Sequence, residues 1–281
     1  MKNTYLFFLM TLLFFSCNKE PDFSNNFSSF FGINDYEKAL SEVGKYAIFA
    51  TVPNGGLLIE NKAAKLAVDQ FYNTSSIFAT FMPDVNLTSN RTDAGIYKVN
   101  GKNWEFKNGQ YLPTDISDND IDNFASSLFG KETELSLEKN NNTIVTTKFY
   151  APLKISELVF SNTTNVDESS AVMWLNKNST EIKWNEDTKN ENGVLLVLSS
   201  QKDKLGIISQ GAKQTTYKVL LIKNDIGSFT IPSSFFNGFE TNDRIRLTLY
   251  RGNFVFIEDD GAGKSYKFYA LSENSRDFAL K

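Results

Sequence analysis

Short runs in which apolar and polar residues alternate fill most of the chain after residue 95. A period of two places successive side chains on opposite faces of a β-strand. Asn, Gly, Asp and Ser interrupt the runs at short intervals, and no long helical pattern separates them. This series predicts sheets packed face to face, since a parallel sheet would need crossover helices. The expected fold class is therefore all-β, with strands in ELSLE, TIVTTKFY, ISELVF, AVMWL, EIKW, GVLLVLSS, TTYKVLLI, GSFTI, RIRLTLY, NFVFIE and SYKFYAL.

Two Asn-Gly pairs mark a β-meander in the segment 95–113. Asn100-Gly101 and Asn108-Gly109 each separate short aromatic and β-branched runs. Asn-Gly between two strands favours a two-residue type I′ turn, because both positions require a positive φ. The segment 61–72 has apolar residues at helical spacing, but its KLAVDQFY part also alternates, and we predict a strand there.

Helix signals are few. Asn34 can cap a helix over 35–43, with Glu37 at the third position and Gly44 after its end. A second short helix is predicted at PSSFFNGF (232–239), where Pro stands in the first turn.

The chain is expected to contain two domains behind a tether. Residues 17–33 mix Asn, Ser, Pro and charged residues, a composition typical of a flexible spacer. Pro152 interrupts a continuous apolar run and favours extended backbone at the residue before it. We therefore place an N-terminal β-sandwich-like domain at 34–152 and a C-terminal β-sandwich domain at 153–281.

The first 17 residues carry an export signal. Lys2 precedes the apolar stretch 5–15, which is too short to cross a bilayer and is typical of a signal peptide. The small Ser16 stands directly before Cys17, the one cysteine of the sequence. This arrangement resembles a bacterial lipobox, which implies removal of the signal peptide 1–16 and acylation of Cys17.

Asn18 follows the cysteine where aspartate would favour the inner membrane, so by analogy the lipoprotein is expected at the outer membrane. The charged residues Lys19, Glu20 and Asp22 resemble the lipoprotein export signals of Bacteroidota. The expected location is lipid-anchored, at the periplasmic face or the cell surface.

Several segments of the chain, from LFG (128–130) onward, resemble uncharacterised two-domain lipoproteins of Bacteroidota. The others are TKFYAPLKI (147–155), IKWNEDTKNENGVLL (182–196) and GSFTIPSSFFNGF (227–239), with RIRLTLYRGNF (244–254). The resemblance implies two Ig-like antiparallel β-sandwich domains in tandem, with one or two short helices. It implies no activity.

Composition narrows the possible chemistry. The sequence has no histidine, which excludes His-based catalytic triads and His-ligated zinc. Acylation of Cys17 would remove thiol chemistry as well. A net charge of −4 without a basic cluster argues against nucleic acid as a partner. An enzyme of this composition would depend on carboxylates, Lys, Tyr or Ser.

Three polar segments are candidate sites. EDDGAGKSY (258–266) lacks the first Gly of a phosphate loop and is predicted to be a hairpin loop. WNEDTKNENGV (184–194) is predicted to be a structural hairpin, with a metal or glycan contact as the alternative. The acidic segment DNDIDN (118–123), with Asp115 before it, could form a loose calcium site or a solvated turn or helix cap. The carboxylates of the calcium site would be Asp115, Asp118, Asp120 and Asp122. No cofactor other than calcium is suggested by the sequence.

The three tryptophans are candidate platforms for a sugar. Trp174 and Trp184 are predicted to pack in the core, since Ile182 shares a strand face with Trp184. Trp104 stands among the charged residues Lys102, Glu105 and Lys107 and is predicted to be the more exposed one, which makes it the candidate for contact with a ligand or partner.

Two functions from different classes follow from these observations. The first is a non-catalytic envelope lipoprotein that binds a glycan or an envelope protein, or takes part in adhesion or assembly. The second is a surface glycoside hydrolase or other carboxylate-based hydrolase, which needs two carboxyl groups about 5–9 Å apart. We expect the binding module and not an enzyme, because no acid pair is marked by the sequence.

Overall fold

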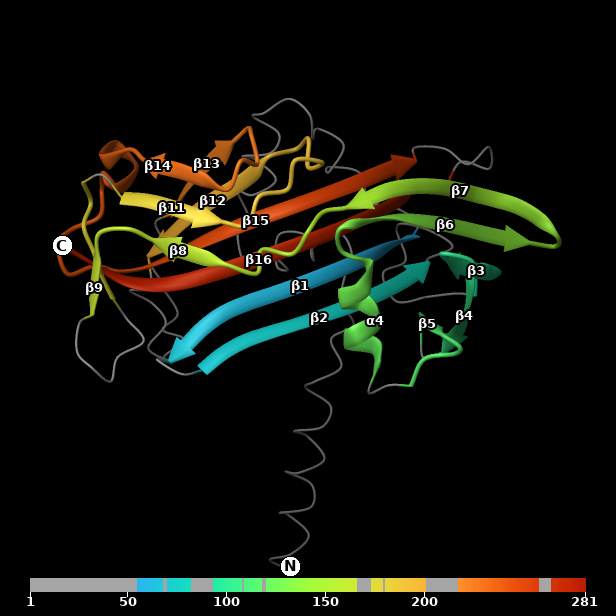
Figure 1. Cartoon of the computed structure of the whole chain (residues 1–281). Coiled ribbons are helices and arrows are strands. Elements are labelled where there is room, and N and C mark those ends of the chain that lie inside the picture. Colours follow the sequence, from blue (N-terminus) through green and yellow to red (C-terminus); the bar gives the residue numbers. More distant parts are fainter. Residues whose placement is uncertain are drawn as a thin grey trace, which may run out of the picture.

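The computed structural model describes residues 55–67, 70–81, 93–107, 109–117, 120–165, 173–178, 180–200, 217–257 and 264–281. These residues form mainly β-strands, with one α-helix and one short 3₁₀-helix (Figure 1). The all-β class predicted from the sequence is therefore confirmed. The signal peptide 1–16, the tether 17–33 and the predicted helix 35–43 lie outside the described residues.

The N-terminal half contributes β1 (Gly55–Ala67), β2 (Gln70–Phe81), β3 (Ile96–Val99), β4 (Lys102–Lys107), β5 (Gln110–Pro113), α4 (Ile121–Leu128), β6 (Lys131–Lys139) and β7 (Asn142–Ala151). The C-terminal half contributes β8 (Leu158–Phe160), β9 (Thr163–Asn165), β10 (Met173–Leu175), β11 (Thr180–Trp184), β12 (Val194–Ser200), β13 (Tyr217–Ile222), β14 (Ser228–Ile231), η3 (Ser233–Phe236), β15 (Arg244–Ile257) and β16 (Tyr266–Leu280).

Strands of both halves belong to one large sheet. Among the described residues it has 13 strands, and its main path runs β13-β12-β15-β16-β1-β2-β5-β4-β3-β6-β7, with β10 and β9 attached to β16. The pairs β1–β16 and β10–β16 are parallel and the others are antiparallel. A second sheet, β14-β11-β8, forms a separate layer. In Figure 1 the long strands β1, β2, β15 and β16 lie side by side along the molecule.

The local turn signals are confirmed. Asn100 and Gly101 have φ of 49° and 75° and join β3 to β4 as a two-residue turn. Lys107 pairs with Gln110, which closes the second hairpin of the predicted meander. The ambiguous segment 61–72 is extended, since its described residues belong to β1 and β2.

The helices differ from expectation in number. The segment 232–239 contains η3, with Pro232 directly before it as predicted. The helix α4 follows the acidic segment that precedes residue 121, for which a helix cap was one of the predicted alternatives. Neither helix in the described part of the chain has the length and apolar character that crossing a bilayer requires.

Two hydrophobic cores lie along the sheet. The first combines side chains of β1 to β7 and α4 with Tyr266, Phe268 and Ala270 of β16. The second lies between the large sheet and the layer of β8, β11, β14 and η3, and it includes Phe278 and Leu280 of β16. This second core has the two-layer arrangement expected of a β-sandwich. The domain boundary at residue 152 stays a prediction, because β16 contributes to both cores.

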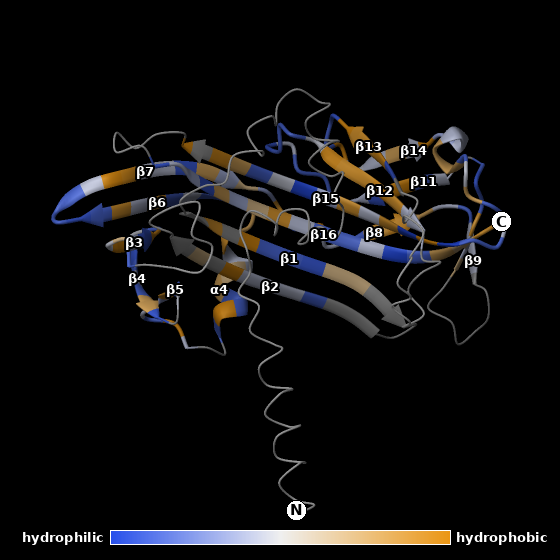
Figure 2. Cartoon of the chain, turned by 180° about the vertical axis from the view of Figure 1, so that it is seen from behind, coloured by the Kyte–Doolittle hydropathy of each residue, from blue (hydrophilic) through white to orange (hydrophobic). Residues whose placement is uncertain are grey.

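A row of buried polar residues separates the two cores. Arg251 of β15 is paired with Ser272 of β16, Ser272 with Asn61 of β1, and Asn61 with Ser75 of β2. These four residues, called the polar row below, are all at most 5% exposed. Figure 2 shows hydrophilic colour along the middle of β15 and β16, between more hydrophobic stretches. The polar row therefore marks where one core ends and the other begins.

The polar row binds the segment that connects the two halves. Arg251 Nη1 donates to the carbonyl of Leu153 at 3.0 Å. Ser272 Oγ accepts the Ile155 N–H at 2.8 Å, and Asn274 Nδ2 donates to the Ile155 carbonyl at 3.0 Å. Because buried backbone groups must be paired, these side chains fix the path of residues 152–157 across the sheet.

Arg251 is held by a buried carboxylate. Its Nε and Nη2 donate to the two oxygens of Asp225 at 2.6 and 2.8 Å, and both side chains are at most 1% exposed. Asp225 also accepts hydrogen bonds from Trp184 Nε1 at 2.7 Å and Asn190 Nδ2 at 2.8 Å. These hydrogen bonds compensate for the free-energy cost of removing the charges of Arg251 and Asp225 from water.

The loop 185–193 was predicted to be a hairpin, and this prediction is wrong. The strand before it, β11, belongs to the small sheet, and the strand after it, β12, belongs to the large one. The loop therefore crosses between layers, and its polar residues form internal bonds. Asp187, which is 3% exposed, accepts the Leu153 N–H at 2.7 Å and the Tyr150 hydroxyl at 3.0 Å.

We predict that Arg251→Met destabilises the protein by about 3–5 kcal/mol, because it leaves the carboxylate of Asp225 buried without its charge partner. The matched control is Arg246→Met. Arg246 forms the same bidentate ion pair with Asp277, but these side chains are 32% and 30% exposed. We expect the control to cost up to about 1 kcal/mol. Denaturant unfolding measures both, and equal losses would contradict the role given to burial.

Candidate functional site

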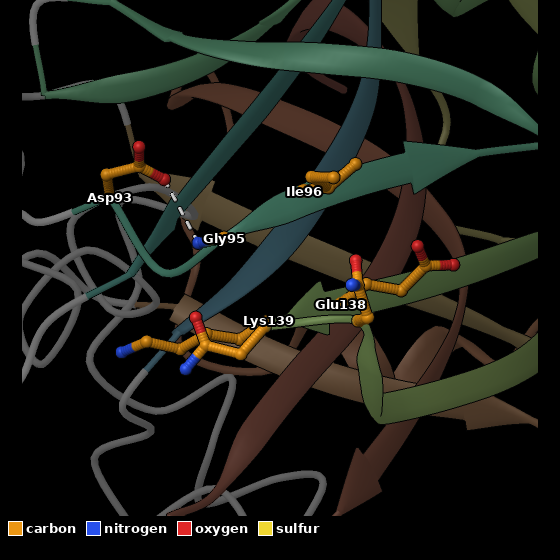
Figure 3. A pocket seen from close by; sticks show the side chains of 7 residues that line it. Asp93, Gly95, Ile96, Glu138 and Lys139 are labelled. Atoms are coloured by element: carbon orange, nitrogen blue, oxygen red, sulfur yellow. Dashed lines mark hydrogen bonds between the residues drawn. The ribbon is translucent and has the colours of Figure 1, made fainter.

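A pocket of about 290 Å³ lies where the start of β3 meets the end of β6 (Figure 3). Ligand pockets in proteins typically span about 300–1,000 Å³, so this one matches a small ligand. It lies at the end of the molecule opposite the C-terminus in Figure 1. Its lining comes from the residues before β3, from β3 and from the β6–β7 turn: Asp93, Gly95, Ile96, Glu138, Lys139, Asn140 and Asn141.

The hydroxyl of Tyr111 organises one wall of the pocket. It accepts the N–H groups of Ala94 and Gly95 at 2.7 and 3.1 Å. Its proton is shared between Asp93 Oδ1 at 2.7 Å and the Gly95 carbonyl at 2.9 Å. Burial raises the pKa of Tyr111 well above its usual value, and the bond to Asp93 adds to the shift. Tyr111 therefore stays protonated and holds the backbone before β3 in place.

The opposite wall is fixed by backbone packing and an ion pair. A Cβ on Gly95, whose φ is 129°, would lie 2.1 Å from the carbonyl oxygen of Glu138, so β3 packs flush against β6. Asn140 and Asn141 have φ of 52° and 62° and form the two-residue turn that starts β7. Lys98 Nζ lies 2.8 and 2.9 Å from the carboxylate oxygens of Glu138. The pocket is thus preformed.

Several polar groups of the pocket remain available to a ligand. In the described part of the chain, Asp93 and Lys139 form no ion pair, and Lys139, Asn140 and Asn141 are exposed. Ile96 is 51% exposed in the same pocket, one of four exposed large apolar side chains among the described residues. Figure 3 shows Lys139 and Glu138 extending in opposite directions from the end of β6. The pocket offers hydrogen-bond donors and acceptors around one apolar contact.

None of these residues was singled out from the sequence. Asp93 and Glu138 come together only through the register of β3 and β6, in which Ile96 is opposite Glu138. The segment KNNN (139–142) between ELSLE and TIVTTKFY is the one local signal, since Asn tolerates a positive φ in a turn.

The prediction that Trp104 is exposed is wrong. Trp104 is 3% exposed, packs edge-on against Tyr97 at a ring distance of 5.8 Å and belongs to the first core. Phe106 lies on the same face of β4, so Glu105 and Lys107 occupy the opposite, exposed face. The core position predicted for Trp184 is confirmed at 5% exposure, and Trp174 is half-buried.

The acidic segment shows a helix start. Asp120 is the N-cap residue of α4 and accepts a hydrogen bond from Ser117 Oγ at 2.7 Å, and Asp122 lies in the first turn. These positions are favourable for negative charge. Within the described residues no three acidic side chains gather as metal ligands, and Asp118 lies outside them. Nothing therefore links Asp115 to Asp120 and Asp122 in a calcium site, and the binding of calcium stays an untested prediction.

The loop resembling a phosphate loop connects two antiparallel strands, with Ile257 opposite Tyr266. The predicted β15–β16 hairpin is therefore confirmed, although residues 258–263 lie outside the described part. Cys17, the predicted lipidation site, also lies outside it.

A second cluster of ionisable residues lies on the face of β1 and β16 opposite to the face of Ile59 and Asn61. Glu60 is 5% exposed, and its Oε1 lies 2.7 Å from Lys62 Nζ. Burial raises the pKa of Glu60 to about 7, although Lys62 opposes the shift. Glu273 is opposite Lys62 in the strand pairing, and burial raises its pKa as well. The two carboxyl groups lie on the same sheet face and interact electrostatically.

The sequence matches no protein-family model, and none of the curated proteins matches it.

We predict that the stability of the protein falls as the pH rises from 5 to 8, because of Glu60. The unfolded chain ionises this residue near pH 4.5, whereas the folded state keeps its proton until about pH 7. Protons bound more tightly in the folded state stabilise it at low pH, and this contribution is lost as pH rises.

Glu60→Gln should remove this dependence. The difference in the free energy of unfolding between the variant and the parent protein should be about 2 kcal/mol more favourable to the variant at pH 8 than at pH 5. Denaturant unfolding at the two pH values measures this difference. Glu105→Gln serves as the control, since the Glu105 side chain is 59% exposed. An equal pH profile for the parent and the Glu60 variant would contradict the assignment.

Proposed function

We propose that this chain is a lipid-anchored envelope protein that works as a non-catalytic binding module, with the pocket at the β3–β6 end as its contact site. The proposal joins a feature of the sequence, the lipobox-like segment ending in Cys17, with a feature of the fold, the preformed pocket. The proposed location is the outer membrane, at its periplasmic face or at the cell surface.

The anchor supports a role at a membrane surface. A diacyl thioether together with an amide-linked acyl chain buries many CH₂ groups at about 0.8 kcal/mol each, so attachment would be effectively permanent. A permanently attached protein encounters ligands that are bound to the envelope or brought to it.

The single observation that supports a binding role is that some polar groups of the pocket are fixed by internal bonds while others are exposed. The carboxylate of Glu138 is occupied by Lys98, and Asp93 accepts hydrogen bonds through one oxygen. Lys139 and the two Asn side chains remain exposed above this fixed framework. The wall itself needs no ordering when a ligand binds, whereas the exposed polar side chains at its rim must be ordered.

One observation favours the alternative, a carboxylate-based hydrolase. Glu60 and Glu273 lie on one face of neighbouring strands, and burial raises the pKa of both. A carboxyl group with a pKa near 7 suits a general acid. Lys62, however, is already engaged with Glu60 as an ion pair, which is an ordinary structural solution for a buried acid.

The anchor is tested by labelling cells that express the full chain with an alkyne analogue of palmitate. We expect the parent protein to carry the label and Cys17→Ser to carry none and to leave the membrane fraction. A Cys17→Ser variant that stays attached, or a parent protein without label, would contradict lipidation.

The pocket is tested with the purified full-length lipoprotein on an array of glycans and envelope proteins. We expect Asp93→Ala and Lys139→Ala each to weaken the binding of a retained ligand by about tenfold or more, since hydrogen bonds to charged groups contribute about 1.5–3 kcal/mol.

The matched controls are Glu105→Ala and Lys107→Ala, an exposed ion pair on β4 whose side chains are 59% and 60% exposed. They should leave the affinity unchanged. Binding that is insensitive to both pocket variants would reject this site. Hydrolysis of a retained glycan that is lost in Glu60→Gln and Glu273→Gln would support the hydrolase instead.

A further inference from the structure

We propose that the ligand group recognised by the pocket is an N-acetylated amino sugar within a glycan. This inference rests on the proposed binding function and goes further, because it assigns the acetamido group to the exposed Ile96 and the neighbouring amide side chains.

The apolar contact of the pocket is small and isolated. Ile96 is 51% exposed, and the six other lining residues offer polar side chains or backbone. Ile96 is directly opposite Glu138 in the β3–β6 pairing, so polar atoms border it closely. An exposed patch of this size matches one methyl group better than the side of a large apolar ligand.

The seven lining residues include no aromatic ring. Stacking on an aromatic face would hold almost any sugar ring, and it is not offered here. Discrimination must then depend on a substituent of the ring. An acetamido group carries a methyl, a hydrogen-bond donor and an acceptor in one plane, which corresponds to an aliphatic side chain beside amides and a carboxylate.

The groups that can meet the amide and hydroxyls are close to Ile96. Asn140 and Asn141 present both donors and acceptors from the β6–β7 turn, and neither side chain is hydrogen-bonded to the described part of the chain. Asp93 accepts from hydroxyl or amide N–H groups, and Lys139 donates to ring oxygens.

The charges of the pocket favour a neutral ligand. Asp93 and Lys139 have opposite signs, and the carboxylate of Glu138 is neutralised by Lys98. A free amino sugar or an acidic sugar would bring a net charge without a net counter-charge. A neutral N-acetylated sugar would not.

The experiment is a titration of the full-length lipoprotein, held in a detergent without a sugar headgroup, with N-acetylglucosamine, N-acetylgalactosamine, glucose, galactose and glucosamine. Saturation-transfer NMR reports which protons of each sugar touch the protein. We expect the N-acetylated sugars to bind about tenfold more tightly than the parent hexoses, with the strongest transfer to the acetyl methyl.

Ile96→Ala provides the specific test. Loss of the aliphatic contact should weaken N-acetylated sugars by about fourfold, the effect of one methylene-sized contact, and leave the weak hexose binding unchanged. Ile226→Ala is the matched control, since Ile226 is 63% exposed and does not line the pocket. It should change neither affinity.

The outcomes separate this inference from the proposed function. Equal affinities for hexoses and N-acetylated sugars, or equal losses for both in Ile96→Ala, would overturn the acetamido assignment and leave a pocket that binds other sugars. Retention of a peptide that depends on Asp93 and Lys139, with no sugar bound, would also overturn it. If nothing binds in a way that depends on these two residues, the proposed function falls as well.

Discussion

The polar row across β15, β16, β1 and β2 is the constraint on which the rest of the fold depends. A sheet this long would form one continuous apolar face if every inward position were hydrophobic, and the chain could then fold back over it in several registers. Arg251, Ser272 and Asn61 interrupt that face. Their hydrogen-bonding groups must be paired when buried. The segment 152–157 supplies backbone partners to Arg251 and Ser272, whereas Asn61 bonds to residues of β2 and to Ser272. These bonds favour the observed path of the segment 152–157 across the sheet.

This constraint also explains what the sequence could predict of the fold. Alternation and Asn-Gly pairs are local signals, so strands and hairpins followed from them. The parallel pairing of β1 with β16 places Gly55 opposite Tyr266, and no local sequence pattern predicts a contact between residues so far apart in the chain. The strand predicted at SYKFYAL stops at Leu271 because Ser272 and Asn274 resemble a strand end, whereas β16 continues to Leu280. Inward polar residues are useful to the fold and misleading in the sequence.

The candidate site was harder to predict than the fold. Its charged neighbours favoured an exposed position for Trp104, yet Glu105 and Lys107 lie on the opposite face of the strand, and alternation with Phe106 indicates the buried face. The pocket residues Asp93 and Glu138 have no shared motif. They meet because Tyr111, on another strand, fixes the backbone before β3 while Gly95 lets β3 approach β6. Such a site arises from tertiary register alone.

The two parts of the proposed function, the lipid anchor and the binding pocket, depend on each other. A pocket of about 290 Å³ with exposed Lys139, Asn140 and Asn141 must order these side chains on binding, at about 0.5–1.5 kcal/mol each, so one sugar unit would be held weakly. Many copies attached to one membrane by Cys17 would meet a repetitive glycan together. The second and later contacts then form at a high effective concentration, which raises the overall affinity without any new contact. Weak single sites on a permanent anchor therefore suit retention of a polymer at the envelope better than capture of a free sugar.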